Sequence, residues 1–417
     1  MRMLPEFFPI RYPFPPFPHA IDAIHAAMAG FTATIVGSTS TLAVTSDAVS
    51  TGCPSYGNPY DGNMTFTLID EAHYDAEMDG KVLPALDACM TEGWMDPATV
   101  DWNGDALPKL DEPGRLHYCC YDAAKFDVLR EDGASGVFRG AIVISHGFTE
   151  FARKYSEMAW YFLLAGYSVC ILEHRGHGHS AHDVSNPSLV WIDDWRRYVA
   201  DFAAFADTVG REYACGEPLN LYCHSMGGGI GAAVMEHYPS LFDKAVLSAP
   251  MIAPVVGMPT WIARIATGAL CGLGFGKARV FGHTDFSPEL DLDEHKGASE
   301  ARVRWFHKQR VDDVACQTNA ATFEWAHQAM ALSRAVLKPD MCGAIETPTL
   351  LFQAGRDVWV LNGPQDDFVE RVREGGGSIE KIRYGKSLHE IFSMPNTVVG
   401  PYVNKILDFL SAPADSL

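Results

Sequence analysis

The stretch LNLYCHSMGGGIGAAV, residues 219–234, decides the fold of this 417-residue chain. It starts with a short run of apolar and β-favouring residues, which predicts a buried strand, and continues with small residues that predict a helix. Ser225 lies at the junction. A serine on a tight turn between strand and helix exposes its hydroxyl group, and the residues two positions away must be small because they crowd the turn.

Those two neighbours are Cys223 and Gly227, where the pattern G-x-S-x-G has glycine twice. A cysteine side chain is small enough for the first position. We therefore interpret this position as requiring a small side chain, not glycine itself. A serine that merely caps a helix would give a similar stretch. The rest of the chain therefore has to decide whether Ser225 is a nucleophile.

Strand-like and helix-like segments alternate around this stretch. AIVIS and YSVCILE precede it, KAVLSA follows it, and TPTLLFQA and SIEKIRY resume the alternation near the C-terminus. Short β-rich runs separated by helices predict an α/β fold, with a mostly parallel twisted sheet covered by helices on both faces. Residues 64–125 are expected to form a helix and a loop leading into this core, and Lys125–Arg130 a strand.

Residues 251–346 interrupt the alternation, because they show helical periodicity and no clear strand. We interpret them as a helical cap inserted into one core that is formed by residues 64–250 and 347–417. Residues 1–63, which begin with a segment rich in proline and aromatic side chains, are expected to be a poorly ordered extension. An export signal or anchor is the alternative for that segment.

The chain carries 52 acidic and 32 basic side chains, which gives a formal net charge of −20. Such an acidic excess repels phosphate backbones, so nucleic acid is not expected as a partner. The ten cysteines form no C-x-x-C pair. We expect free thiols in a reducing compartment, no zinc site, and a cytoplasmic protein that is free or peripheral to a membrane.

A serine becomes a good nucleophile only when a base takes its proton. On a sheet of this kind the acid and the base follow the serine in that order along the chain. His389 is the only histidine after TPTLLFQAGRD, and it follows the strand-like SIEKIRY. Asp357 comes directly after the preceding strand and is the expected acid, whereas Asp366 and Asp367 are weaker candidates because they lie in a helical pattern.

The oxyanion of the tetrahedral intermediate needs backbone N–H donors. We expect one from Met226, which follows the nucleophile, and one from Phe148 in the loop HGFTE, where Gly147 permits a close approach. His224 is not assigned as the base, because adjacent residues on a sharp turn point apart.

The segment EHRGHGHSAH gathers His174, His177, His179 and His182. We interpret it as a loop with glycine turns after the strand YSVCILE, and we expect no metal, because activation of a serine by histidine requires none.

Together the motifs HGFTE, EHRGHGHS and HSMGGG resemble the lysophospholipase and monoacylglycerol lipase group of α/β-hydrolases, which is often labelled serine-aminopeptidase-like. The resemblance runs from about Thr65 to Leu410 and is closest to the bacterial lysophospholipase branch, which accepts a small residue other than glycine at the position of Cys223. It implies an α/β-hydrolase fold with a helical cap over the site, and no cofactor. It also implies a catalytic triad and two oxyanion donors: Ser225, Asp357, His389, Phe148 and Met226.

The expected function is hydrolysis of the carboxylic ester of a monoacyl lipid, a lysophospholipid or a monoacylglycerol. A short-chain carboxylesterase and a serine aminopeptidase remain alternatives, and acidic residues within 285–300 could hold the amine of a peptidase substrate. A non-catalytic binding module is disfavoured by the complete Ser/Asp/His set. The uncharged run IATGALCGLGFG in the cap packs inside it as a buried helix, lines an acyl-chain tunnel, or makes transient contact with a membrane surface. These alternatives stay open. The oligomeric state stays open.

Overall fold

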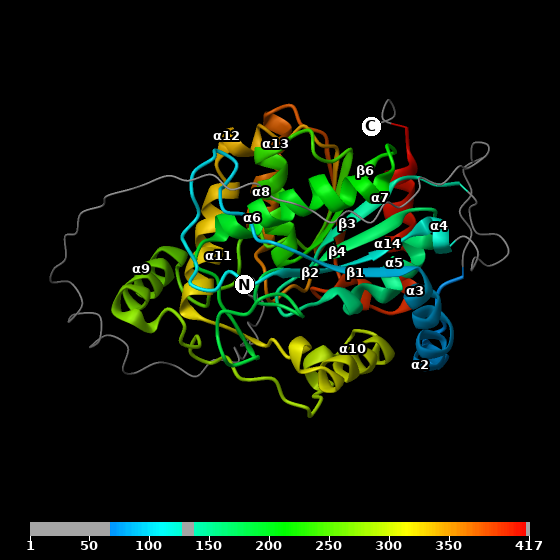
Figure 1. Cartoon of the computed structure of the whole chain (residues 1–417), viewed down its shortest axis with the longest axis horizontal. Coiled ribbons are helices and arrows are strands. Elements are labelled where there is room, and N and C mark those ends of the chain that lie inside the picture. Colours follow the sequence, from blue (N-terminus) through cyan, green and yellow to red (C-terminus); the bar gives the residue numbers. More distant parts are fainter. Residues whose placement is uncertain (1–66, 127–136, 414–417) are drawn as a thin grey trace, which may run out of the picture.

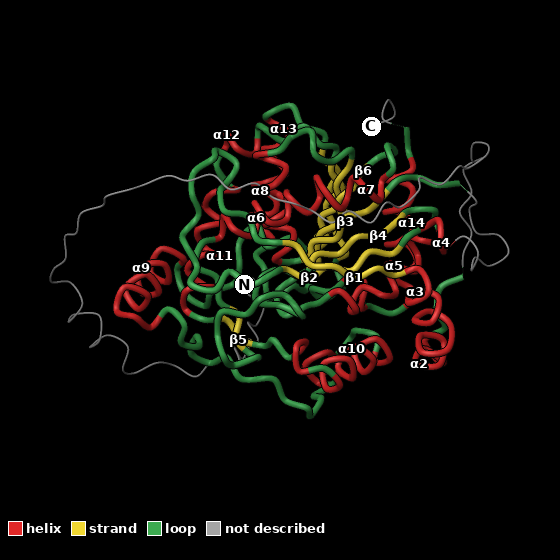
Figure 2. The backbone as a smooth tube through the Cα atoms, viewed as in Figure 1, coloured by secondary structure: helices red, strands yellow, loops and turns green. Residues whose placement is uncertain are grey.

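The computed structural model describes residues 67–126 and 137–413 (Figure 1). The extension expected over residues 1–63 lies outside the described residues. Within them an eight-stranded sheet has the order β1-β2-β4-β3-β6-β7-β9-β10. Figure 2 draws the strands in yellow between the red helices. The strands of this sheet are β1 (Met90–Met95), β2 (Leu116–Tyr121), β3 (Ala141–Ser145), β4 (Ser168–Leu172), β6 (Leu219–His224), β7 (Lys244–Ser248), β9 (Thr349–Ala354) and β10 (Ile379–Tyr384).

The six strands from β4 to β10 pair in parallel, and β2 pairs antiparallel with both β4 and β1. The predicted α/β fold with a mostly parallel sheet is therefore confirmed. Parallel strands are covered on both faces, which explains why AIVIS and SVCIL are completely buried.

Helices cover each face of the sheet and enclose two apolar cores (Figure 1). Along β6, Leu221 and Cys223 face one core while Tyr222 faces the other, as the two-residue period of a strand requires. The first core receives side chains from α6 (Trp195–Phe205), α8 (Met226–His237), α11 (Phe323–Val336) and α13 (Asn362–Glu374). The second receives them from α3 (Leu83–Cys89), α5 (Ser156–Leu164) and α14 (Asn396–Ser411).

The helix and loop expected over residues 64–125 are only partly found. Short helices, α2 (Tyr74–Glu77) and α3, do occur, but β1 and β2 then extend the sheet. MTEGWM has weak β propensity. It forms an edge strand because Gly93, which has no side chain, leaves room for the Tyr118 ring of β2. Gly93 pairs with Tyr118, and a side chain at Gly93 would overlap the Tyr118 ring.

The prediction of a strand over Lys125–Arg130 is wrong for its first two residues, because Ala123–Phe126 forms the short helix α4. The Asp122 side chain accepts a hydrogen bond from the backbone of Ala124 at 2.9 Å, which stabilises this turn. Residues 127–130 lie outside the described part of the chain.

Residues 251–346 contain α9 (Thr260–Leu270), α10 (Glu300–Asp312), α11 and α12 (Pro339–Cys342), and they lie between β7 and β9. The expectation that this segment holds no strand is corrected by β8 (Ala320–Ala321), which pairs in parallel with β5 (Leu189–Val190). Two residues are too short for a visible period in the sequence. None of the described helices is both long enough and apolar enough to cross a membrane.

Glu236 on α8 carries a buried carboxyl group that finds no hydrogen-bond partner among the described residues. Burial, together with repulsion from Asp340, raises the pKa of Glu236 from 4.5 to about 9. Because the folded pKa lies above the unfolded value, folding takes up a proton between these limits and becomes less favourable as pH rises.

Glu236→Gln keeps the shape of the protonated acid and removes this proton uptake. We expect it to raise the free energy of unfolding by about 3 kcal/mol at pH 7, since each pKa unit corresponds to about 1.4 kcal/mol. Urea unfolding between pH 4 and pH 8 measures this difference, which should shrink to nothing near pH 4. A constant difference across that range would contradict the assignment.

Candidate active site

Ser225 occupies a strained turn between β6 and α8. Its backbone has φ 50° and ψ −118°, a conformation that residues other than glycine rarely adopt. Hydrogen bonds hold it there: its N–H donates to Ser248 O at 3.1 Å, and its carbonyl accepts from Met251 N at 2.7 Å. Gly227 is required because a Cβ would overlap the carbonyl oxygen of Ser145, so α8 approaches β3 closely.

The space that the Cys223 side chain needs is supplied by Gly231, about one helical turn after Gly227 on α8. The Cys223 side chain is fully buried, and a Cβ at Gly231 would overlap its sulfur atom. The cysteine in place of the first glycine is therefore accommodated by Gly231.

Gly231→Ala is expected to lower the free energy of unfolding by about 1–3 kcal/mol through overpacking. Cys223→Gly should be tolerated, and the double variant Cys223→Gly/Gly231→Ala should recover most of the loss. A thermal-unfolding double-mutant cycle measures this coupling. Additive effects would show that the two positions do not compete for space.

The structure brings Ser225, His389 and Asp357 together from three separate loops. His389 Nε2 lies 2.8 Å from Ser225 Oγ, and His389 Nδ1 lies 2.6 Å from Asp357 Oδ2. Asp357 follows β9 and is completely buried, and its Oδ1 accepts N–H groups from Trp359 and Val360 at 2.9 and 3.0 Å. This geometry allows Nδ1–H to donate to the carboxylate while Nε2 accepts the serine proton.

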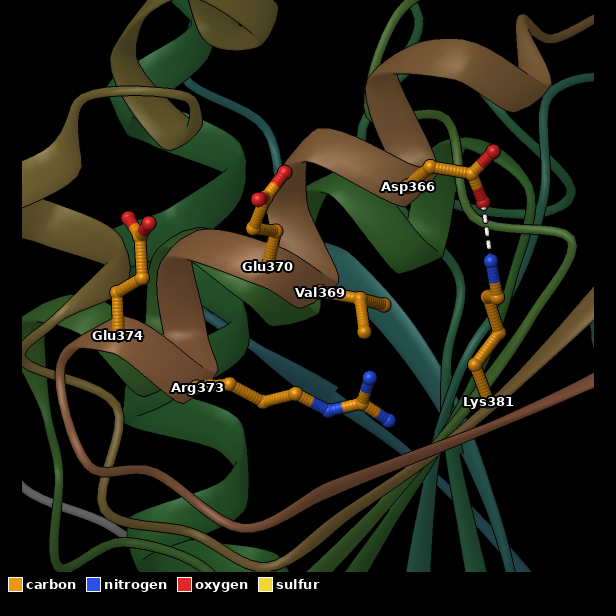
Figure 3. A pocket seen from close by; sticks show the side chains of 6 residues that line it. All are labelled: Asp366, Val369, Glu370, Arg373, Glu374 and Lys381. Carbon is orange, nitrogen blue, oxygen red and sulfur yellow. Dashed lines mark hydrogen bonds and ion pairs between the residues drawn. The ribbon is translucent and has the colours of Figure 1, made fainter.

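The weaker acid candidates lie elsewhere. Asp366 on α13 accepts hydrogen bonds from Lys381 and Gln353, and Asp367 is exposed on the same helix. A surface hollow of about 490 Å³ lies there, lined by one face of α13 and by Lys381 of β10 (Figure 3). It contains none of the triad residues and is lined mainly by charged side chains, so we do not consider it the active site.

The expected oxyanion donors are Phe148, in the loop after β3, and Met226, directly after Ser225. Neither Phe148 N nor Met226 N donates a hydrogen bond to any described residue. Thr149, which follows Phe148, has φ 61°, so the loop after β3 turns sharply. The ring centre of Phe148 lies 4.1 Å from that of Trp325, so α11 packs directly on this loop.

The His224 side chain contacts Glu150, and the hydrogen-bond partner of Ser225 Oγ is His389. His224 Nδ1 lies 3.0 Å from Glu150 Oε1, and the His224 ring centre lies 4.9 Å from that of His389. Sequence reasoning missed Glu150 as a contact of the site. The signal was present in the charged pair Glu150 and Lys154, spaced by four residues just after the HGF turn.

The histidine-rich loop is largely buried. Burial lowers the pKa of His174 and His177, and likewise that of His146 beside them, so these rings are neutral at pH 7. His146 Nδ1 donates to Gly147 O at 2.8 Å, and its Nε2 accepts the N–H of His174 at 2.9 Å. The three rings thus help to fix the loop that carries Phe148.

Two overlapping sets of side chains have donor atoms within 4.8 Å of one another, a spacing that a metal ion could use. They are Glu92, His117 and Cys119, and His117, Glu173 and His179. Hydrogen bonds already join the second set: Glu173 Oε2 accepts from His117 Nδ1 at 2.9 Å and from His179 N at 2.6 Å. These contacts account for the arrangement, and the serine chemistry does not use it.

Comparison with protein families matches residues 136–396 to the family described as serine aminopeptidase, S33. The match covers more than half of the chain. The protein belongs to this family. As a serine aminopeptidase S33 member it has all five predicted site residues inside the matched segment, while β1 and β2 lie outside it.

Named relatives are lipid esterases. Lysophospholipase L2 of Escherichia coli strain K12 is 28% identical over 286 residues, which cover 65% of this chain and 80% of the relative. The monoacylglycerol lipase of Mycolicibacterium smegmatis is 33% identical over 128 residues, covering 31% of this chain and 44% of the relative. The family, the α/β-hydrolase fold and a hydrolase of the lipase and esterase type are therefore established for this chain.

Solved structures agree in fold. A soluble variant of monoglyceride lipase from Saccharomyces cerevisiae, in complex with a substrate analogue, has a TM-score of 0.54 at 19% identity, covering 76% of this chain and 96% of that structure. A carboxyl esterase from Bacillus coagulans gives 0.54 at 16% identity, covering 77% and 98%.

Proposed function

We propose that this protein cleaves the carboxylic ester of a monoacyl lipid, a lysophospholipid or a monoacylglycerol, through an acyl-enzyme on Ser225. The observation that carries the reaction type is the hydrogen-bonded series from Asp357 through His389 to Ser225. The substrate class rests on the names of the relatives, lysophospholipase and monoacylglycerol lipase.

In the first half of the reaction His389 Nε2 takes the proton of Ser225 Oγ as this oxygen attacks the ester carbonyl carbon. The carbonyl oxygen becomes an oxyanion and accepts the N–H groups of Phe148 and Met226. His389 then gives its proton to the leaving alcohol oxygen, the ester C–O bond breaks, and the acyl group remains on Ser225. Asp357 stabilises the imidazolium form of His389 throughout.

In the second half His389 takes a proton from water, and the resulting hydroxide attacks the acyl carbon. The second tetrahedral intermediate uses the same two N–H donors. Its collapse returns the proton to Ser225 Oγ and releases the fatty acid. Each N–H donor is worth about 10²–10³ in rate, so the position of the loop that holds Phe148 contributes directly to the rate.

The cap contributes an apolar surface through which we propose that substrate is drawn from lipid aggregates. Trp261 and Ile265 lie on one face of α9 and are 65% and 60% exposed. Val358 and Trp359, beside the acid Asp357, are 68% and 66% exposed. The N–H of Val255 donates to Trp359 O at 2.8 Å, so the start of the cap and the acid loop are joined.

A matched pair of substrates tests this surface. Trp261→Ala/Ile265→Ala should raise KM for monoacylglycerol in zwitterionic micelles and leave turnover of soluble p-nitrophenyl butyrate unchanged. Trp94→Ala, which removes an exposed tryptophan from β1, is the control. Equal effects on both substrates would contradict a role in lipid contact.

The substrate class is tested by side-by-side turnover of a lysophospholipid, a monoacylglycerol, p-nitrophenyl butyrate and an aminoacyl p-nitroanilide. We expect kcat/KM to be highest for one of the two monoacyl lipids. Preference for the butyrate would indicate a short-chain esterase, and preference for the anilide an aminopeptidase. Asp285, one acidic candidate for an amine site, is ion-paired with Arg279 at 2.8 Å.

A further inference from the structure

Three charged side chains join the loops that carry the catalytic residues, and the mechanism above does not use them. Glu150 lies after β3, Lys154 lies in the turn before α5, and Glu390 directly follows His389. The Glu150 and Lys154 side chains are each only 3% exposed, and that of Glu390 is 35% exposed. Charged groups are rarely buried so deeply unless they are paired.

Glu150 contacts two of the catalytic segments with one carboxylate. Its Oε2 accepts the N–H of Gly147 at 2.5 Å, directly before the oxyanion donor Phe148. Its Oε1 lies 3.0 Å from His224 Nδ1, directly before Ser225. The position of this carboxylate therefore sets where the oxyanion loop lies relative to the nucleophile.

Lys154 extends the connection to the third segment. Its Nζ donates to Glu150 Oε1 at 2.8 Å and to Glu390 Oε1 at 2.6 Å. It also lies 4.1 Å from the ring centre of Phe306 on the cap helix α10. One ammonium group thus bridges two carboxylates that belong to the oxyanion loop and to the base loop.

The charges persist at neutral pH. Burial alone would raise the pKa of Glu150, but the neighbouring His224 and Lys154 hold it well below its ordinary range. Burial would likewise lower the pKa of Lys154, but Glu150 and Glu390 raise it. Without the ammonium group, two carboxylates would face each other with no positive charge between them.

We infer that Lys154 is a positioning residue, which holds the loops of Phe148, Ser225 and His389 in one arrangement through Glu150 and Glu390. The inference rests on the proposed serine mechanism. A shift of about 1 Å in a catalytic group can lower the rate about 10²-fold. We therefore expect the bridge that Lys154 forms between these loops to affect kcat. The Lys154 side chain contacts none of the four residues of the apolar surface proposed for lipid contact, so KM should change little.

The test compares Lys154→Met, Lys154→Arg and the matched control Lys244→Met. Lys244 is also a buried lysine, and its Nζ donates to Phe409 O and Leu410 O. Lys244 is the first residue of β7 and lies at the opposite end of that strand from Ser248. The substrate is p-nitrophenyl butyrate, and each rate is divided by the amount of folded protein. Lys154→Met should lower kcat about 30–100-fold and change KM less than about threefold. Lys154→Arg, which keeps the charge, should stay within about fivefold of wild type, and Lys244→Met should keep wild-type kcat.

If wild type is active and Lys154→Met has the same kcat as the Lys244→Met control, the inference is wrong and the proposed function stands. Inactive, folded wild type would instead overturn the proposed function. If Lys154→Met does not fold, Glu390→Gln decides, because its side chain is partly exposed and keeps its shape. We expect about a tenfold loss of kcat from Glu390→Gln, and an unchanged kcat would contradict the inference.

Discussion

His389→Ala is expected to lower kcat on a monoacyl lipid ester by on the order of 10⁶, with the fold intact. His389 is the group whose Nε2 lies 2.8 Å from Ser225 Oγ, so its removal leaves the serine without a base for attack and the leaving alcohol without an acid. Steady-state release of fatty acid measures the loss, and circular dichroism confirms folding.

His295→Ala is the matched control, because His295 is exposed, between β7 and β9 in the chain, and contacts none of the triad residues in the described structure. It should retain wild-type kcat. A loss of less than about tenfold in His389→Ala would mean that another group takes the serine proton.

Asp357→Asn is expected to lower kcat by on the order of 10⁴ while KM changes little. The asparagine amide would offer N–H to His389 Nδ1, which favours the wrong tautomer and leaves Nε2 protonated. The buried Oδ1, which accepts two backbone N–H groups, keeps an acceptor in the variant if the amide oxygen occupies that position. The loop should therefore stay folded.

Asp366→Asn is the control for this change, because Asp366 pairs with Lys381 and Gln353 and with none of the triad residues. We expect kcat within about twofold of wild type. If Asp366→Asn were the damaging change and Asp357→Asn the mild one, the acid assignment would be wrong.

The sequence was sufficient to predict the site where strong local constraints coincide. The turn at Ser225 needs a strand, a small residue and a glycine in fixed order, and Gly227 meets this because any side chain would overlap Ser145. Asp357 and His389 could be predicted because each directly follows a β-rich run, and parallel strands bring their carboxyl ends to one edge.

The parts that could not be predicted depend on contacts between distant residues. β1 is a strand because Gly93 packs under Tyr118, and neither residue signals this alone. The match of Cys223 with Gly231, and the bridge from Glu150 through Lys154 to Glu390, likewise require knowledge of which loops meet. Local propensity carries no such information.

Labelling with a fluorophosphonate probe tests the central claim most directly, because the probe reacts covalently with an activated serine. The account predicts rapid labelling of wild type at one site, loss of labelling in Ser225→Ala, and mass-spectrometric location of the adduct on Ser225. No labelling of folded wild type, or equal labelling of the Ser225→Ala variant, would contradict the assignment of Ser225 as the nucleophile.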